Sequence, residues 1–412
     1  MVNMKNYISH DACRLCGNIP LTPFLDLGEQ FISDFVSRDL VSSGRKAPLN
    51  LVKCAKCTLI QLRDTAPQEL LFTGNYWYRS GVTQIMRNAL HDLYEVGTKE
   101  ANLQAGDYIL DIGANDGTLL EFFNDDFITV GCEPALNLQS ELENRCNFVL
   151  DKLWSFEELK KSLDFDVTRR FKLVYAIGMF YDLDNPVEFV KDIEKCLAEN
   201  GIFISQLMCL KSMLDANDLG NICHEHIEYY SFESLKYLFE KCGLEIFKIE
   251  VNEINGGSYR IFARRFISGS ISFYENITDS SLEDFKNEIE NNRNLCVNFI
   301  KNEREKGKTI HLYGASTKGN TILQYYDLTC KEIEYASERS ENKLGLFTIG
   351  TGIPIVSEKF SREQNPDYYL VMPWAFIDEF IEREKEWLKS GGKFILPLPK
   401  FKVLTFENLN EK

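Results

Sequence analysis

The spacing of apolar residues changes several times along the chain, and these changes predict the order of its elements. Short apolar runs at 108–112, 127–130, 171–177 and 202–206 are typical of buried strands. Apolar residues at helical spacing separate such runs, most plainly over 186–199. This βαβα order predicts a doubly wound parallel sheet, which binds its ligands at the carboxyl ends of the strands.

The chain is long enough for more than this sheet. Its 412 residues exceed one ordinary core, so further domains are expected. A strand-like run at 49–52 lies in an N-terminal region with several turn residues, and 308–313 begins a second strand–turn–helix pattern. We therefore expect an α/β protein of two or three domains. The family resemblance described below implies three: a small β-rich module at 1–65, a central sheet domain at 66–265 and a C-terminal α/β domain at 266–412.

The composition of the chain limits its expected cellular location and its expected binding partners. The formal charge of −16 disfavours a broad nucleic-acid surface, and no apolar run approaches the ~20 residues of a membrane span. The start of the chain has no signal-peptide core, so its 12 cysteines are expected to stay reduced. We expect a cytoplasmic protein that binds neither nucleic acid nor membranes.

Two Cys-x-x-Cys knuckles stand apart from the other cysteines. Cys13 and Cys16 form the first, and Cys54 and Cys57 form the second. Each knuckle offers two thiolates on one turn, and together they supply the four sulfur ligands of zinc. Four sulfurs leave no open position for catalysis, so we predict a structural Zn²⁺. The alternatives are four unrelated buried cysteines or a redox pair.

The first predicted strand of the sheet ends in the pattern Asp-x-Gly-x-Asn-x-Gly. Its glycines permit a tight turn against a ligand, and an acid follows the next strand, where such sheets bind a ribose diol. Acids in the turn would repel a pyrophosphate but suit a cationic ligand. An ordinary strand–turn–helix is the alternative. The pattern resembles the first motif of class I S-adenosylmethionine (SAM) methyltransferases, and the implied SAM-binding residues are Asp111, Gly113, Asn115, Gly117 and Glu133.

The segment 221–231 has the composition of a catalytic loop. It holds two of the five histidines, His224 and His226, with Glu225 between them. In an extended segment the histidines would point to one side and Glu225 to the other. Histidine exchanges protons readily near neutral pH, so a general base is the natural role. A hydrogen-bonded structural pair and a second metal site are the alternatives.

Three more segments could contribute to a site. Aromatic residues at 76–78 precede the sheet, either as a lid over the ligand or as ordinary packing. On the predicted topology the loop 179–184 lies beside the ligand. The glycine turn 314–319 contains Lys318, and turn amides with a lysine could hold a phosphate. A purely structural turn is the alternative for this last segment.

Five motifs, taken in order, resemble the nucleotide-sugar C-methyltransferases. They are the cysteine tetrad, the SAM loop, Cys-His-Glu-His-x-x-Tyr-Tyr-Ser from Cys223, Asn-Gly-Gly-Ser-Tyr-Arg from Asn255 and Tyr-Gly-Ala-Ser-Thr-Lys-Gly-Asn from Tyr313. The resemblance covers nearly the whole chain. It implies a zinc-binding N-terminal module, a class I methyltransferase domain and a C-terminal Rossmann-like domain that enclose a keto-sugar nucleotide. It also implies a monomeric enzyme of deoxysugar biosynthesis.

The resemblance further implies roles for single residues. His226 is the expected base, and Glu225 and His224 are expected to line the pocket, with Tyr78 as the fourth catalytic residue. Many family members have tyrosine in place of Cys223 and histidine in place of Asn255 and around Phe180, which suggests a different sugar or different polar contacts. The expected substrate-binding residues are Cys223, Tyr229, Asn255, Arg260, Lys318 and Asn320.

The expected reaction is carbon methylation next to a ketone. His226 would remove the proton α to the sugar carbonyl, and the enolate carbon would then attack the methyl group of SAM in line. One alternative is O-methylation of a sugar hydroxyl with the same base. The other is a protein that binds SAM or a nucleotide without turnover.

Overall fold

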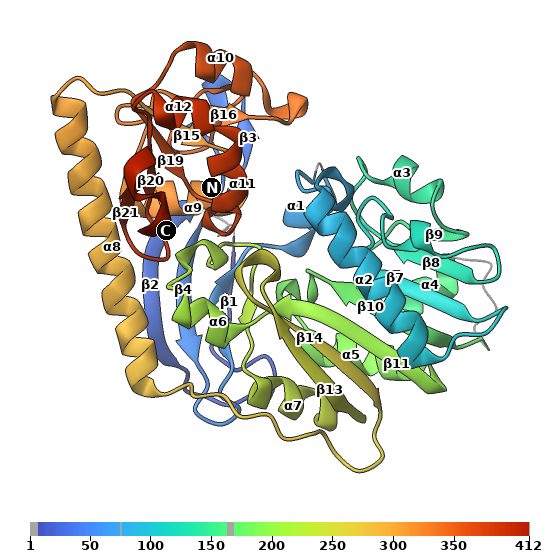
Figure 1. The fold of residues 1–412 in the computed structure, drawn as a ribbon. Helices are drawn as coiled ribbons and strands as arrows, with labels where there is room; N and C mark the ends of the chain where they lie inside the picture. The colour runs from blue at the N-terminus through green and yellow to red at the C-terminus, as the bar shows by residue number, and fades with distance from the viewer. Residues whose placement is uncertain (1–6, 75, 163–168, 412) are drawn as a thin grey trace, which may run out of the picture.

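The computed structural model describes residues 7–74, 76–162 and 169–411; the start of the chain, used above to judge targeting, lies outside them. Figure 1 shows the central sheet domain (cyan to olive) on one side and the C-terminal domain (orange to red) on the other. The N-terminal strands (blue) run between them, with the long helix α8 (Asp279–Glu305) along the outer edge. The three expected parts are therefore recognisable by eye.

The central domain contains a seven-stranded sheet of order β13-β14-β11-β10-β7-β8-β9. Strands β7 to β11 are parallel to their neighbours within that group, which confirms the doubly wound α/β fold. The strands are β7 (Tyr108–Ile112), β8 (Ile128–Cys132), β9 (Phe148–Leu150), β10 (Phe171–Ile177), β11 (Leu197–Met208), β13 (Leu244–Asn252) and β14 (Ser258–Arg265).

Alternate residues of the strands supply two separate cores. Leu173 and Tyr175 of β10 pack with helix α2 (Gln84–Ala101) on one face. Val174 and Ala176 belong to the core on the other face, which is covered by α5 and α7. Because side chains alternate across a strand, a nearly continuous apolar run is what a sheet buried on both faces requires. The remaining helices of this domain are α3 (Gln139–Glu143), α4 (Phe156–Ser162), α5 (Pro186–Cys196), α6 (Leu210–Asp215) and α7 (Phe232–Lys241).

Two local expectations are corrected. The edge strands β13 and β14 pair antiparallel because they form a hairpin, so the sheet is mixed. The helix expected after the glycine turn is only the 3₁₀ turn η3 (Leu120–Phe122). Arg145 donates to the backbone carbonyl of Asp116 at 2.6 Å, and the Thr118 hydroxyl donates to the carboxylate of Asp116. Side chains thus satisfy polar groups of residues 116–118, which do not form an α-helix.

The N-terminal module forms an antiparallel sheet that includes one strand from the central domain. Its order is β12-β5-β4-β2, and β12 (Glu228–Tyr229) follows directly on the histidine loop. Two smaller pairs extend the module: β1 with β6, and β3 with β17 of the C-terminal domain. The bounds are β1 (Ile8–Ser9), β2 (Thr22–Phe31), β3 (Phe35–Val36), β4 (Lys46–Lys53), β5 (Ile60–Leu62), β6 (Asp64–Thr65) and β17 (Phe347–Thr348), followed by helix α1 (Gln68–Phe72).

The C-terminal domain has a six-stranded sheet of order β18-β16-β15-β19-β20-β21, parallel except for its last pair. Helix α9 (Thr317–Tyr326) begins inside the expected glycine turn, because Ser316 caps it by accepting from Gly319 N–H. The other elements are β15 (Ile310–Tyr313), β16 (Tyr335–Glu338), β18 (Ile355–Ser357), β19 (Tyr368–Val371), β20 (Lys393–Leu396), β21 (Lys402–Leu404), α10 (Glu358–Glu363), α11 (Ile377–Arg383) and α12 (Lys385–Lys389).

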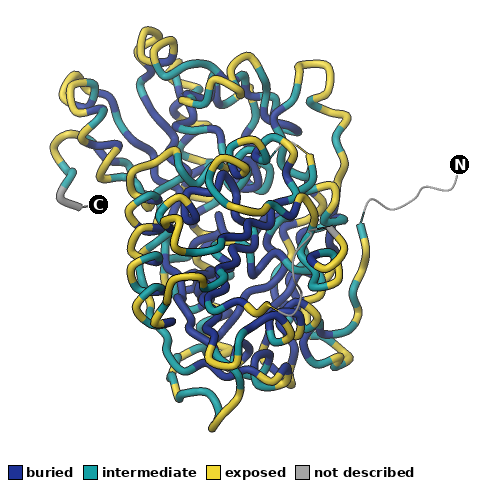
Figure 2. The backbone as a smooth tube through the Cα atoms, turned by 90° about the vertical axis from the view of Figure 1, so that its right-hand side faces the viewer, coloured by how far each residue is buried: buried dark blue, intermediate teal, exposed yellow. Residues whose placement is uncertain are grey.

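Burial is distributed through all three parts. Figure 2 shows the buried backbone (dark blue) at the centre of the molecule and the exposed backbone (yellow) mainly in its outer loops. Within the described ranges, none of the helices has the length and apolar character needed to cross a membrane.

Candidate active site

A cavity of about 450 Å³ lies between the central domain and the C-terminal domain. Its walls include the carboxyl ends of β7, β8 and β10, the loop 218–226, the start of α9 and the segment 372–376. Doubly wound sheets bind ligands at this end. The cavity therefore lies where the topology predicts a site.

The glycine loop and the acid after β8 form one end of the cavity. Glu133 accepts backbone hydrogen bonds from Asn115 at 3.0 Å and from Ala135 at 2.8 Å, and these fix its carboxyl at the wall. Gly113 has φ +73°, and a Cβ there would lie 2.8 Å from Met179 Cγ. Only glycine fits this close approach.

Asp111 lies at the same end and keeps one carboxyl oxygen free. Its Oδ1 is buried and has no hydrogen-bond partner in the described part of the chain. Burial, and next the charge of Glu133, raise the pKa of Asp111 well above its ordinary value. An unpaired buried carboxyl beside a second acid suits a cationic ligand. SAM carries a sulfonium and an ammonium group, so these residues fit it.

Gly117, which was expected to contact the cofactor, lies outside the cavity lining. It has φ +77°, and a Cβ there would lie 3.0 Å from Leu142 Cδ1. The residue is thus needed for the turn and for packing behind the loop.

The aromatic segment before α2 is tied to the glycine loop. Ser80 N–H donates to Asn115 Oδ1 at 2.9 Å, and Asn115 Nδ2 donates to the carbonyl of Tyr78 at 3.1 Å. Tyr76 and Tyr78 both line the cavity, and Tyr78 is 46% exposed. The segment therefore contributes to the wall at the donor end of the cavity.

The histidine loop is a tight turn and not the expected extended segment. His226 N–H donates to the carbonyl of Cys223 at 3.2 Å, which reverses the chain over 223–226. Glu225 and His226 consequently line the cavity together, whereas His224 is not part of the lining. The expectation that the two histidines share one side is therefore corrected.

His224 points towards the N-terminal module. Its Nε2–H donates to the carbonyl of Ala47 on β4 at 2.9 Å, and its Nδ1 is buried with no partner among the described residues. Burial lowers the pKa of His224 to about 4. A neutral ring held in this way anchors the loop from outside the cavity lining.

His226 has the geometry of a proton acceptor. Its Nδ1–H donates to the carbonyl of Asn221 at 2.7 Å, so Nε2 keeps its lone pair, and Nε2 has no partner in the described ranges. The ring meets the Tyr181 ring edge-on, with 4.6 Å between centroids. Burial, and next the charge of Lys318, lower the pKa of His226 well below its ordinary value. The ring is therefore neutral at neutral pH, and its Nε2 lone pair is available to accept a proton.

Lys318 links the C-terminal domain to this loop. Its Nζ donates to Asn221 Oδ1 at 2.9 Å, and the backbone carbonyl of the same Asn221 accepts from His226. Burial raises the pKa of Glu225 to about 7, and Lys318 opposes that shift. One ammonium group thus acts electrostatically on both cavity residues of the turn.

Two of the expected substrate-binding residues, Asn255 and Lys318, line the cavity. Arg260 instead forms an ion pair with Asp92 at 2.7 Å, and Asn320 donates to a backbone carbonyl of the C-terminal domain at 3.2 Å. These side chains are already used in internal hydrogen bonds. The expected substrate-binding residues that are buried outside the cavity lining are Cys223, Tyr229, Arg260 and Asn320.

The cavity also contains residues that the motifs do not single out. Tyr181 and Asp182 lie on η4 (Phe180–Asp182) after β10, and Asn221 precedes the histidines. The sequence signal for Tyr181 and Asp182 is their position, since the loop after a strand's carboxyl end faces the site, and Asn221 is the first residue of the candidate catalytic segment. Phe180 is fully buried and packs against other aromatic rings outside the lining.

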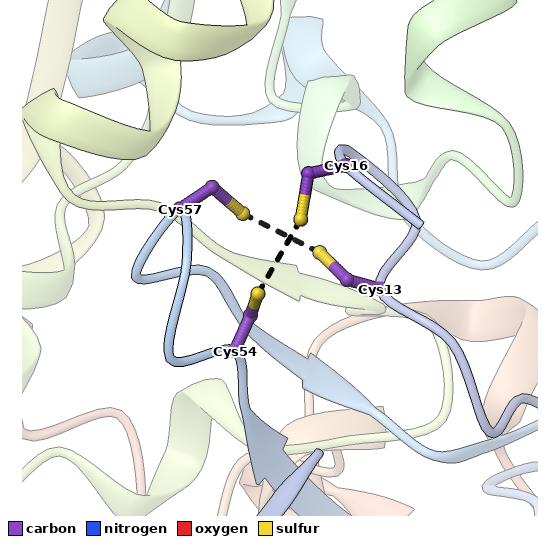
Figure 3. Close-up of side chains that lie close together, drawn as sticks. All are labelled: Cys13, Cys16, Cys54 and Cys57. Atoms are coloured by element: carbon purple, nitrogen blue, oxygen red, sulfur yellow. Dashed lines mark hydrogen bonds between the residues drawn. The ribbon is translucent and has the colours of Figure 1, made fainter. Parts of the chain in front are cut away.

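The four cysteines of the two knuckles converge as predicted. Figure 3 shows their sulfurs pointing at one another from two loops. All four sulfurs lie within 4.8 Å of one another, with Cys13 and Cys57 at 3.4 Å and Cys16 and Cys54 at 3.5 Å. Sulfurs of a tetrahedral zinc site with bonds of ~2.3 Å lie slightly farther apart. The cluster therefore fits a structural Zn²⁺ and confirms the predicted ligands as a group.

Comparison with known families matches each part of the chain separately. Residues 13–72 match a zinc binding domain, residues 79–249 a methyltransferase domain, and residues 253–399 the C-methyltransferase C-terminal domain. C-methyltransferase NovU of Streptomyces niveus is 28% identical, over 97% of this chain and 98% of its own.

Solved methyltransferases resemble the central part only weakly. A SAM-dependent methyltransferase of Clostridium acetobutylicum is 15% identical, with TM-score 0.34, and covers 43% of this chain and 92% of its own. The magnesium protoporphyrin IX methyltransferase of Synechocystis with bound SAM is 8% identical, with TM-score 0.33, and covers 44% and 79%. These scores are too low to carry an argument about this chain.

The sheet topology, the cavity and the matched domains together define a SAM-dependent methyltransferase with a structural zinc site. The similarity to NovU runs through all three matched parts, because it covers 97% of this chain. The chain is thus similar to C-methyltransferases in all three of its parts, as the sequence motifs predicted.

Proposed function

We propose that this enzyme transfers the methyl group of SAM to a carbon next to the ketone of a keto-sugar nucleotide. The observation that carries the proposal is the position of His226. Its Nδ1–H donates to the carbonyl of Asn221, which leaves Nε2 free to accept a proton. His226 lines the same cavity as Asp111 and Glu133, the proposed SAM-binding acids. A protein that only stored SAM would not need a desolvated base in that cavity.

The proposed reaction begins with proton transfer to His226 Nε2 from the carbon α to the ketone. The negative charge that develops on the ketone oxygen is stabilised by the Lys318 ammonium group, which lies close enough to shift the pKa values of both Glu225 and His226. SAM supplies the electrophilic methyl group when it is bound at Asp111 and Glu133. Holding both substrates in one enclosed cavity contributes up to ~7–11 kcal/mol in favourable cases.

The nucleotide part of the acceptor is proposed to lie against α9. Ser316, Thr317, Lys318 and Gly319 at the start of this helix line the cavity. A helix N-terminus with a lysine is a favourable place for phosphate oxygens. We further propose, from the family resemblance, that the enzyme acts as a monomer in deoxysugar biosynthesis.

The test is to incubate the protein and SAM with a panel of keto-sugar nucleotides and to analyse the products by mass spectrometry. The expected result is one acceptor that gains a methyl group, together with S-adenosylhomocysteine. An α-deuterated acceptor should lose its label, because C-methylation removes that proton. Retention of the label in a methylated product would show O-methylation, and a protein that binds SAM without any product would refute the proposed function.

A further inference from the structure

Asn221 is the last residue of the 3₁₀ turn η5 (Leu219–Asn221), which directly precedes the histidine loop. The residue is buried and lines the cavity. Its backbone carbonyl accepts from His226 Nδ1–H at 2.7 Å. A carbonyl oxygen can only accept, so this contact places the ring proton on Nδ1 and leaves the lone pair on Nε2. The position of this carbonyl therefore selects the tautomer in which His226 can act as a base.

An acid and a lysine from different domains hold the side-chain amide of Asn221. Its Nδ2 donates to Asp218 Oδ2 at 3.0 Å, and its Oδ1 accepts from Lys318 Nζ at 2.9 Å. The reverse orientation would point the amide NH₂ at the ammonium group, and neither of these groups can accept a hydrogen bond. Only one orientation of the amide is therefore compatible with its neighbours.

The two groups that hold the amide are themselves fixed. Asp218 caps η5, because its Oδ1 accepts from Gly220 N–H at 3.0 Å. Lys318 lies in the first turn of α9, and η5 packs against this helix: a Cβ added at Gly220 would lie 3.5 Å from Ile322 Cδ1. The amide of Asn221 is thus held where the central domain meets the C-terminal domain.

We propose that Asn221 is a positioning residue for the base: its amide, fixed by Asp218 and Lys318, holds in place the backbone carbonyl that orients His226. This inference rests on the proposed function, in which His226 is the base. Because the amide and the carbonyl belong to one residue, fixing the amide limits how far the carbonyl can rotate away from the imidazole. The base is fully oriented only when the C-terminal domain is docked, since Lys318 belongs to that domain.

The test is nitrogen-15 NMR of the whole protein labelled at its five histidines, which distinguishes the Nδ1–H from the Nε2–H tautomer. The spectrum of His226→Asn identifies the signals of His226, and the wild type should show the Nδ1–H form. Asn221→Leu is similar in size but removes both amide contacts. It should add an Nε2–H population and reduce kcat by about tenfold, because a poorly oriented imidazole is a weaker general base. SAM affinity should stay within about twofold.

A second variant and a matched control accompany this substitution. Asn221→Asp keeps an oxygen that accepts from Lys318 but loses the Nδ2–H donor, so both effects should be smaller; it serves as the test where Asn221→Leu does not fold. Asn292→Leu, the control, removes a buried amide of α8 that donates to the Pro399 carbonyl and accepts from Phe401 N–H, both at 3.0 Å. It should lower the thermal transition but leave the His226 signals and kcat unchanged.

The outcomes separate this inference from the proposed function. An unchanged Nδ1–H tautomer in both Asn221 variants, or a changed tautomer with wild-type kcat, would refute the role of Asn221 and leave sugar-nucleotide methylation in place. An Nε2–H tautomer in the wild type would refute it as well. Wild-type protein that methylates no acceptor, although His226 is in the Nδ1–H form, would instead refute the proposed function and with it the catalytic role of Asn221. The NMR measurement needs no acceptor, so the two failures are distinguishable.

Discussion

At the scale of single residues, the turn over 223–226 directs the side chains of His224 and His226 to different sides of the loop. His226 lies in the cavity with a free Nε2, whereas His224 donates to Ala47 of the N-terminal module. We expect His226→Asn to reduce methyl transfer by about 10²-fold or more, because it removes the general base. SAM affinity by calorimetry should stay within about twofold, because no donor contact is lost.

A histidine outside the site provides the control for that substitution. His91→Asn alters a half-exposed ring on α2 and should leave turnover unchanged. Full turnover of His226→Asn would contradict the assignment and would leave the cavity residues Tyr181 or Tyr78 as the candidate base. His224→Asn should slow turnover less, since that ring acts through the loop.

Glu133 gives the corresponding prediction for the donor. Glu133→Ala removes the carboxyl that accepts from the backbone of Asn115 and Ala135, and SAM binding should weaken by roughly tenfold or more. Zinc content should not change, because the cysteine cluster lies on another element. Glu143→Ala, an exposed acid on α3, is the control. Wild-type SAM affinity in Glu133→Ala would rule out this acid as a cofactor contact.

At the scale of elements, the zinc module and the catalytic loop share a sheet. Strand β12 pairs with β5, with Glu228 opposite Gln61 and Tyr229 opposite Ile60. The knuckle residue Thr58 is also 3.1 Å from Ser231, between the two hydroxyl oxygens. Strand β12, which follows His226, is thus hydrogen-bonded to strand β5, which follows the zinc ligands Cys54 and Cys57.

This pairing makes zinc removal a catalytic perturbation as well as a structural one. Cys54→Ser should lower zinc content below the expected value of about one ion per chain, lower the thermal transition, and reduce kcat more than SAM affinity. Metal analysis, calorimetry and turnover measure these three effects. Cys330→Ser, at an exposed free cysteine, should change none of them. Unaltered stability in metal-free protein would refute the structural role of zinc.

At the scale of the whole molecule, the C-terminal domain contributes a charge to a loop of the central domain. Lys318 on α9 hydrogen-bonds Asn221 and lowers the pKa values of both Glu225 and His226. Removing a positive charge makes protonation of both groups easier, so both pKa values rise. In Lys318→Met the acidic limb of the kcat/KM profile should therefore move to higher pH.

The control is Lys308→Met, a lysine of the same domain that pairs with Asp367 outside the cavity. It should leave the pH profile in place. A profile that does not move in Lys318→Met, or that moves to lower pH, would contradict the electrostatic link between the domains.

The local sequence was sufficient to predict those features of this protein that depend on residues close together in the chain. Apolar runs predict the strands of the central sheet, two knuckles predict the metal ligands, and the glycine pattern with Glu133 predicts the donor end of the cavity. Each of these signals reflects a constraint within a few residues, such as a positive φ at Gly113 or two thiolates on one turn.

The tertiary structure decided which side chains face the cavity. The histidine loop has the composition of a catalytic segment, but its turn is held by Ala47 and by β5, which lie far away in sequence. For the same reason Arg260 and Asn320 look like ligand-binding residues in their motifs and yet bond internally, while Asp182 has no motif and lies unpaired in the cavity. Side-chain direction depends on partners brought together only by folding, so residue type alone does not determine it.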